Sequence, residues 1–282
     1  MSQVRRRGSS DEGGQEFASR GRKKWAAAAA ARVGVRAGLC YSATMTRAEA
    51  SFPIKICGLS TPETLEAALA AGADMIGLVF HPKSPRFVMP DLASRLAAQA
   101  RGKAEIVALT VDIEPAKAAE LAQLLQPDWL QLHGSETPDA VRAIKAATGL
   151  PALKALGIAT AADLQRIEPY AGSADMILLD AKPPKDAAYP GGHGRPFDWA
   201  LLAGLDPAFG FMLSGGLDPA NVAEAIRIAR PAGVDVSTGV ESAPGVKDVD
   251  RIAEFVKAAR GAAQALNDDR LNDDMLKKAG KA

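Results

Sequence analysis

The chain has 282 residues, of which 48% are hydrophobic, and such a chain can bury a large core in one or two domains. Its two cysteines, Cys40 and Cys57, are too few for a disulfide scaffold or a cysteine-rich zinc site, and they favour a reducing cytoplasm. No run of about 18 apolar residues occurs, which argues against a membrane-spanning segment.

The formal net charge of +1 is unevenly distributed along the chain. Residues 1–50 contain ten Lys or Arg and four Asp or Glu, whereas residues 51–282 contain 24 basic and 29 acidic side chains. An acidic excess makes a poor surface for a polyanion, so we do not expect a nucleic acid partner. A small anionic ligand would then have to be held locally, by backbone amides.

The first 50 residues lack the pattern of a folded domain. They are rich in Arg, Gly, Ser and Ala and show no sustained apolar periodicity, so we predict a disordered extension over residues 1–50. An arginine-rich targeting peptide is the alternative, although the acidic residues Asp11, Glu12 and Glu16 count against it. Met45 is a second candidate for the natural start, because the organised pattern begins a few residues after it.

From residue 52 onward, short apolar runs alternate with longer segments of helical pattern. The predicted strands are residues 53–58, 73–80, 105–112, 129–134, 152–157, 176–181, 209–216 and 234–240. The predicted helices are residues 62–71, 91–100, 115–125, 138–147, 161–167, 197–203, 219–229 and 249–259. Helix starts are supported by prolines at first helical positions (Pro115, Pro138, Pro219) and by candidate N-caps (Ser60, Thr137, Asp218).

Eight alternations of strand and helix, with no two strands in succession, predict a parallel sheet. Eight is also the number of strands that closes an α/β barrel in about 200–250 residues. We therefore predict a single (β/α)8 TIM barrel over residues 51–262, with a doubly wound open sheet as the structural alternative. The charged residues 263–282 are predicted to form a C-terminal tail that is frayed or makes a short helical appendage.

Polar residues at the carboxyl ends of the strands are the candidates for function, because active sites of such barrels lie there. Period-two alternation directs the apolar set of each strand toward the helices and the polar set toward the barrel mouth. The polar set comprises Lys55, Cys57, Trp129, Gln131, His133, Asp180, Asp235 and Ser237.

Purely structural roles are the alternatives for these residues. Cys57 would then be an inert buried side chain, His133 a satisfied wall residue, and Asp180 an ion-pair partner of Lys182 or a helix cap. A layer of buried ion pairs inside the barrel would use Lys55, Lys154 and Asp235.

Two glycine-containing loops predict a phosphate site. They follow the seventh and eighth predicted strands, where barrels of this kind bind phosphate, and glycine lets backbone amides approach the anion closely. The candidate residues are Ser214, Gly215, Gly216, Ser237, Thr238 and Gly239.

Seven motifs together resemble a known family. They are Lys55-Ile56-Cys57-Gly58, Gly77-Leu78-Val79-Phe80 with Lys83-Ser84-Pro85-Arg86, Gln131-Leu132-His133-Gly134, Leu178-Leu179-Asp180, Gly191-Gly192-His193-Gly194 with Phe197-Asp198-Trp199, Leu213-Ser214-Gly215-Gly216-Leu217, and Val234-Asp235-Val236-Ser237 with Gly239-Val240-Glu241. In this order, over residues 53–260, they resemble the phosphoribosylanthranilate isomerase family of tryptophan biosynthesis.

The resemblance implies an aldose–ketose isomerase that catalyses an Amadori rearrangement of N-(5-phosphoribosyl)anthranilate without a cofactor or a metal. It implies that Asp180 is the general acid at the ring oxygen and Cys57 the general base at the second sugar carbon. It also implies that Arg86 pairs with the anthranilate carboxylate, that the glycine loops hold the phosphate, and that the remaining site residues are Gln131, His133 and Asp235. We expect a monomer or homodimer.

The acid–base roles suit the residue types, since such an isomerisation needs one acid and one base. We expect Lys55, on the same strand face as Cys57, to raise the thiolate fraction of that cysteine. Two positions depart from the family pattern, Ala181 and His193, where a hydroxyl residue is usual in each case.

Three other readings are rivals. A metal-dependent pentose-phosphate epimerase would need several histidines at strand ends, and this chain has three histidines in all, of which His81 and His193 lie in predicted loops. An enzyme of the indole-glycerol-phosphate synthase type would need a catalytic lysine pair, for which Lys55 and Lys154 are the candidates. A non-catalytic phosphosugar-binding barrel would not need both Cys57 and Asp180.

Overall fold

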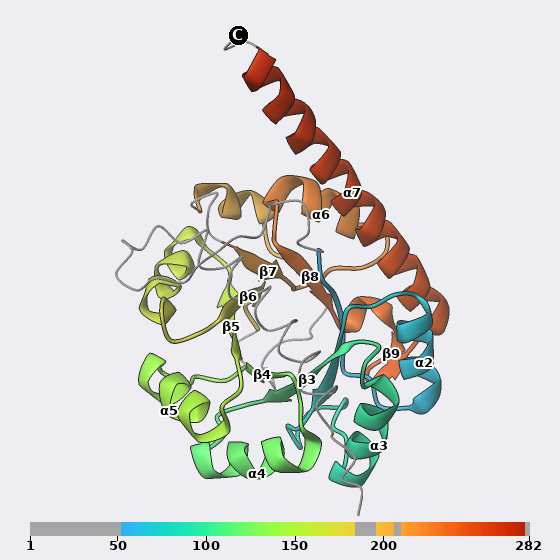
Figure 1. Cartoon of the computed structure of the whole chain (residues 1–282), viewed down its shortest axis with the longest axis vertical. Coiled ribbons are helices and arrows are strands. Elements are labelled where there is room, and N and C mark those ends of the chain that lie inside the picture. Colours follow the sequence, from blue (N-terminus) through green and yellow to red (C-terminus); the bar gives the residue numbers. More distant parts are fainter. Residues whose placement is uncertain (1–51, 184–195, 206–209, 280–282) are drawn as a thin grey trace, which may run out of the picture.

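Eight parallel strands form a closed barrel in the computed structural model, which describes residues 52–183, 196–205 and 210–279 (Figure 1). The predictions for residues 1–50, Cys40 and His193 fall outside these ranges. The strands are β1 (Ile54–Cys57), β2 (Met75–Val79), β3 (Glu105–Thr110), β4 (Trp129–Leu132), β5 (Ala152–Ile158), β6 (Met176–Ala181), β7 (Phe211–Leu213) and β8 (Gly233–Val236).

The barrel closes between its first and last strands. β1 pairs with β8 in parallel, with Ile54 opposite Val234 and Lys55 opposite Asp235. The predicted (β/α)8 barrel is therefore confirmed, and the open doubly wound sheet is wrong. The carboxyl ends of all eight strands consequently meet at one mouth.

Six α-helices cover the outside of the barrel within the described ranges. They are α2 (Pro62–Ala70), α3 (Pro90–Ala100), α4 (Pro115–Leu125), α5 (Pro138–Thr148), α6 (Val222–Ala229) and α7 (Val249–Ala279). Proline is the first residue of α2 to α5, where its missing N–H costs no intrahelical hydrogen bond. The predicted N-cap Thr137 is confirmed, because its side chain accepts a hydrogen bond from the Ala140 amide.

Two predicted helix starts are wrong. Thr61, not Ser60, caps α2 and accepts from the Thr64 amide. α6 begins at Val222 rather than near Pro219. The Asp218 carboxylate accepts from the Ala220 and Asn221 amides and so closes a turn before α6 instead of capping it.

The fifth and sixth connections contain 3-10 turns where α-helices are predicted. These are η1 (Ala161–Arg166), η2 (Glu168–Tyr170) and η3 (Trp199–Gly204). Pro169 in η2 prevents a helix from continuing out of η1, because proline has no N–H to donate to the carbonyl of Gln165.

The last helix is longer than the sequence predicts. Residues 266–279, expected to form a tail that frays or makes a short helical appendage, continue α7, which has 31 residues and extends past the barrel (Figure 1). Among its described side chains, those that contribute to the core are Ile252, Phe255, Val256, Ala259 and Leu266. None of the described helices is long and apolar enough to cross a membrane.

Side chains alternate along the strands as predicted. The outward set, including Ile54, Ile56, Leu130 and Leu132, packs with the helices in the main core. The inward apolar set fills the barrel below the mouth with Met75, Val107, Trp129, Leu153, Ala155, Met176, Leu178 and Met212. Above this plug, a small apolar cluster of Val79 and Leu109 contacts Cys57. The polar candidates Lys55, Gln131, Asp180 and Asp235 are also buried on the inward face, which places them at the mouth.

The predicted eighth strand is shorter than expected and is followed by a hairpin. β8 ends at Val236, and the chain then forms η4 (Thr238–Val240), β9 (Glu241–Ala243) and β10 (Val246–Lys247). β9 and β10 pair antiparallel. This β9–β10 hairpin is absent from the sequence prediction.

Candidate active site

An ion pair lies directly beneath the mouth. Lys55 Nζ is 2.7 Å from Asp235 Oδ1, and both side chains are buried. The Ser214 hydroxyl donates to the other oxygen of Asp235 at 3.1 Å. Burial works to lower the pKa of Lys55, but the carboxylate of Asp235 and the thiol of Cys57 raise it above its ordinary value. Asp235, predicted to bind substrate, is therefore the counter-ion that keeps Lys55 charged.

Cys57, the last residue of β1, lies in a space that Gly77 leaves open. A Cβ atom added at Gly77 would lie 2.9 Å from Cys57 Sγ and 3.0 Å from Lys55 Nζ. Burial raises the pKa of the Cys57 thiol, and the positive charges of Lys55 and Lys247 oppose this shift without cancelling it. The expectation that Lys55 raises the thiolate fraction is correct in sign, but the net shift goes the other way because burial dominates.

Asp180, near the end of β6, is joined to two residues of the β4 end. His133 Nε2 is 3.2 Å from Asp180 Oδ2, and the Gln131 side-chain amide nitrogen is 3.1 Å from His133 Nδ1. The Ala181 amide donates to Asp180 Oδ1 at 2.8 Å. Both oxygens of Asp180 therefore meet nitrogen donors when the proton of a neutral His133 ring is on Nε2.

Lys182 is not the partner of Asp180. It pairs instead with Asp163, at 2.9 Å, and this corrects one structural reading of Asp180. Gln131 is completely buried, and its Oε1 has no partner among the described residues. Gln131 contacts His133, so its position supports that ring from beneath the predicted substrate site.

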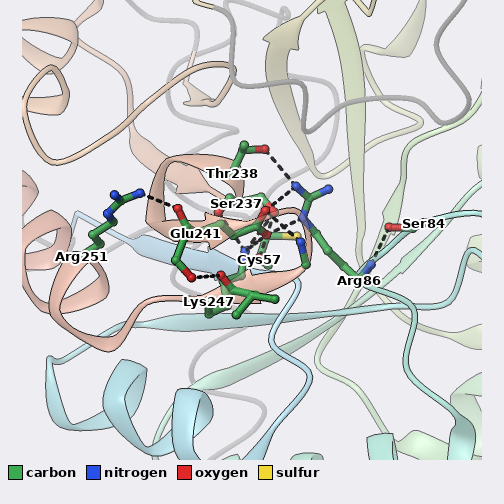
Figure 2. Close-up of polar contacts among 11 residues, drawn as sticks. Cys57, Ser84, Arg86, Ser237, Thr238, Glu241, Lys247 and Arg251 are labelled. Carbon is green, nitrogen blue, oxygen red and sulfur yellow. Dashed lines mark hydrogen bonds and ion pairs between the residues drawn. The ribbon is translucent and has the colours of Figure 1, made fainter.

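Arg86 lies in the loop after β2 and forms a bidentate pair with Glu241 (Figure 2). Arg86 Nε is 2.7 Å from Glu241 Oε1 and Nη2 is 2.8 Å from Oε2. Nη2 also donates to the Thr238 hydroxyl at 3.0 Å. The Arg86 guanidinium, which the resemblance pairs with the substrate carboxylate, is therefore bound along its Nε–Nη2 edge by the carboxylate of Glu241.

Lys247, in β10, completes this group. Its Nζ lies 2.7 Å from Glu241 Oε1, and it also donates to the backbone oxygen of Ser237 at 2.9 Å. Burial lowers the pKa of Lys247 to about 8, although Glu241 works against this shift. For Glu241, burial works to raise the pKa, but Arg86 and Lys247 hold it below its ordinary range.

Lys154, on β5, belongs to a separate buried pair. Its Nζ lies 2.6 Å from Glu136 Oε2 and 2.7 Å from the Gly134 carbonyl. The predicted ion-pair layer is therefore correct for Lys55 and Asp235 and wrong for Lys154. The two lysines sit in different pairs, which weakens the reading of a catalytic lysine pair.

The two glycine loops provide backbone amides, as a phosphate site requires. Gly215 and Gly216 both have positive φ, at 86° and 68°, and their amides donate to no acceptor in the described ranges. Ser214 contributes less than predicted, because its amide donates to Leu179 and its hydroxyl to Asp235. The Ser237 hydroxyl is likewise committed, to the Cys57 carbonyl.

The loops touch each other closely at Gly239, where an added Cβ would lie 1.9 Å from the Leu217 carbonyl oxygen. The amides of Gly215, Gly216 and the Thr238–Gly239 turn stay candidates for the predicted phosphate site. No group of three or more His, Cys, Asp or Glu side chains that could hold a metal ion occurs among the described residues.

Sequence reasoning missed three charged residues around the mouth, namely Glu136, Glu241 and Lys247. Glu241 belongs to a quoted motif but has no role in the prediction. The signal that could have identified Glu241 is its position directly after Gly239 and the apolar Val240, at the end of a barrel strand. Its partner could not be identified, because Arg86 lies 155 positions away.

Comparisons with known proteins agree on one family. A family model described as N-(5'phosphoribosyl)anthranilate (PRA) isomerase matches residues 54–258. A protein of Rhodopseudomonas palustris (strain BisB5), named N-(5'-phosphoribosyl)anthranilate isomerase, is 55% identical over 216 residues, which is 77% of this chain and 99% of that protein.

Solved structures agree as well. Phosphoribosyl anthranilate isomerase from Thermotoga maritima superposes with a TM-score of 0.69 at 39% identity, over 75% of this chain and all of that one. A structure of such an isomerase in complex with reduced 1-(o-carboxyphenylamino)-1-deoxyribulose 5-phosphate gives a TM-score of 0.66 at 36% identity, over 75% of this chain and 100% of that chain.

Proposed function

This chain belongs to the N-(5'-phosphoribosyl)anthranilate isomerase family and is an isomerase of tryptophan biosynthesis, and we propose that Cys57 and Asp180 are its base and acid. The observation that carries this assignment is their placement. Both side chains are buried at the carboxyl ends of strands, on β1 and β6, at the same barrel mouth. Other strands supply the groups for substrate binding, as a two-sided proton transfer requires.

The reaction converts an aminoaldose into an aminoketose, and the proposed acid and base each carry out one of its proton transfers. Asp180 gives a proton to the ring oxygen as the bond from that oxygen to the first sugar carbon breaks, and the anthranilate nitrogen supplies the electron pair that forms an iminium. Cys57 then removes the proton from the second carbon. The electrons of that C–H bond form a carbon–carbon double bond and neutralise the iminium, and the resulting enolamine tautomerises to the ketone.

The surroundings of Asp180 suit the carboxylate that its proton transfer leaves behind. His133 Nε2 and the Ala181 amide nitrogen face its two oxygens at 3.2 and 2.8 Å. These donors stabilise the carboxylate that forms when Asp180 has given up its proton, and they require no reorganisation at that moment. His133 is thus assigned as the residue that orients the acid.

The surroundings of Cys57 have opposing effects on the formation of its thiolate. Burial raises the pKa of the thiol, whereas Lys55 and Lys247 lower it. The base is therefore a thiolate that forms against a desolvation cost, with two buried ammonium groups limiting that cost. This explains why two lysines lie close to a cysteine in the interior of a barrel.

Phosphate and carboxylate are bound at separate places in this proposal. The amides of Gly215, Gly216 and Gly239 hold the phosphate, and Arg86 pairs with the anthranilate carboxylate. The hydrogen bond from Arg86 to Thr238 links the two regions. We further propose a cytoplasmic enzyme that is a monomer or a homodimer.

The test is turnover of N-(5-phosphoribosyl)anthranilate by the purified full-length chain, followed through the anthranilate fluorescence. We expect multiple turnovers without added metal or cofactor. Asp180→Asn should lose about 10²–10⁴ in rate and should still bind the reduced product analogue. Absence of turnover by the unmodified chain would overturn the function, and a fully active Asp180→Asn would overturn the assignment of the acid.

A further inference from the structure

The β9–β10 hairpin contributes a buried charge cluster that the acid–base chemistry does not require. We call Arg86, Glu241 and Lys247 the Glu241 cluster. Glu241 accepts from Arg86 at 2.7 and 2.8 Å and from Lys247 at 2.7 Å. The side chains of all three are at most 5% exposed. Two positive charges therefore share one negative charge, in a place that water barely reaches.

The formal charge of this cluster is +1. Arg251 also reaches Glu241, but it donates to the backbone oxygen, is half-exposed and pairs with Asp248. It therefore adds little to the charge inside. Without Lys247, the pair of Arg86 and Glu241 would be neutral, and its bidentate contact would leave no net charge for a ligand.

We propose that Lys247 neutralises Glu241, so that the charge of Arg86 stays available to the carboxylate of the substrate. This inference rests on the proposed pairing of Arg86 with that carboxylate. Lys247 is then a positioning residue that sets specificity for a carboxylate-bearing substrate without touching it. Glu241 fixes the guanidinium, and Lys247 cancels the electrostatic cost of using a carboxylate for this purpose.

The hairpin is built to hold this arrangement. The Gly245 amide donates to Glu241 Oε2 at 3.2 Å, and a Cβ atom added at Gly245 would lie 2.5 Å from the Pro85 carbonyl oxygen. The turn of the hairpin thus packs directly on the residue before Arg86. Lys247 also donates to the Ser237 hydroxyl at 3.2 Å, and that hydroxyl donates to the Cys57 carbonyl. Figure 2 shows this continuous set of contacts.

Charge counting makes the inference testable with few variants. The native cluster has a charge of +1, Lys247→Met reduces it to 0, and the double variant Glu241→Gln with Lys247→Met returns it to +1. Lys247→Arg keeps the charge. The matched control is Lys117→Met, since Lys117 is 69% exposed and, among the described residues, pairs with Glu120 on the same helix.

The measurement is the ratio of two dissociation constants. One ligand is the reduced product analogue, which carries a carboxylate on its aromatic ring, and the other is the same molecule with a hydrogen in place of that carboxylate. We expect Lys247→Met to reduce the preference for the carboxylate-bearing ligand by about tenfold or more. The double variant, Lys247→Arg and the control should stay within about threefold of the native ratio.

Two results would overturn the inference. One is a native ratio in folded Lys247→Met, and the other is a double variant whose ratio is as low as that of the single variant, although its cluster charge is again +1. Circular dichroism shows which variants are folded. Arg86→Met tests the pairing of Arg86 with the substrate carboxylate separately from the role of Lys247. An unchanged ratio in Arg86→Met would refute that pairing.

A second measurement applies even if Lys247→Met does not fold. The groups that face Lys247 are Glu241 in its own hairpin, Arg86 after β2 and Cys57 at the end of β1. Because Lys247 loses its proton near pH 8, the native preference for the carboxylate should fall between about pH 7 and pH 9. Lys247→Arg should abolish this fall, and an equal fall in both proteins would contradict the inference.

Discussion

Replacing Gly215 with alanine should damage the acid more than the fold. Gly215 has a φ of 86°, and a Cβ atom there would lie 2.3 Å from the Ala181 amide nitrogen and 3.0 Å from Asp180 Oδ1. Gly72 is the matched control, since its φ is 85° and its added Cβ meets nothing within 4 Å. The two variants share the same backbone strain. They differ in the collision with the residues around the acid, which is read from kcat, and in the proposed phosphate contact of Gly215, which is read from KM.

The magnitudes follow from these contacts. The left-handed backbone costs an alanine about 1–2 kcal/mol at either site. At Gly215 the collision adds about 1–3 kcal/mol, as is typical of an overpacked interior. Relief requires the end of β6 to move by about 1 Å, and a misplacement of that size costs about 10²-fold in rate. We therefore expect Gly215→Ala to lose about 10²-fold in kcat and Gly72→Ala to keep the native kcat.

Both variants are assayed by urea unfolding and by steady-state fluorescence of the anthranilate substrate. Gly215→Ala should be the less stable of the two and still folded at neutral pH. A native kcat in folded Gly215→Ala would show that the end of β6 tolerates displacement, which would refute the argument that Asp180 is held in a fixed position. A large loss of kcat in Gly72→Ala would show that backbone strain alone lowers the rate, and would refute the attribution of the Gly215→Ala loss to the collision.

Two further predictions concern the Lys55–Asp235 ion pair and the neighbouring Cys57. Lys55→Met leaves the Asp235 carboxylate buried without its partner and should lower the free energy of unfolding by about 3–5 kcal/mol, measured by urea denaturation; a loss below about 1 kcal/mol would mean that the pair is open to solvent. Because burial raises the pKa of Cys57, its thiolate should appear only above the ordinary thiol range when the ultraviolet absorbance of the native protein is titrated against that of Cys57→Ser. A transition below that range would show that the lysines outweigh burial.

The architecture follows from local patterns in the sequence. Period-two alternation identifies which residues of each strand face the mouth, and the structure confirms this for Cys57, His133, Asp180 and Asp235. The number of alternations determines barrel closure. Both inferences need only residues that are close in sequence, which is why they succeed.

The partners of these residues could not be predicted in the same way. The sequence indicates that Lys154 is available for an ion pair, but closure of the barrel decides which carboxylate it meets. Glu241 reaches Arg86 only because the β9–β10 hairpin folds back over the loop after β2. The hairpin is missed since β10 has two residues, too few for a periodic signal.

Helix type also depends on more than pattern. The segments at residues 161–167 and 197–203 carry helix-forming residues but form 3-10 turns. In the first case Pro169 interrupts the ladder, and Asp163 binds the Thr160 amide and Lys182. Contacts with the next loop therefore override local propensity.

The most direct test of the acid–base assignment is the single-turnover rate of Cys57→Ser as a function of pH. Serine preserves the size of the side chain but cannot ionise in the accessible range, so we expect a rate lower by about 10²–10⁴. We also expect the loss of the pH dependence that Cys57 gives to the native enzyme, with binding of the reduced product analogue retained. Substantial activity in Cys57→Ser with an unchanged pH profile would contradict the account and would leave His133 or a bound water as the base.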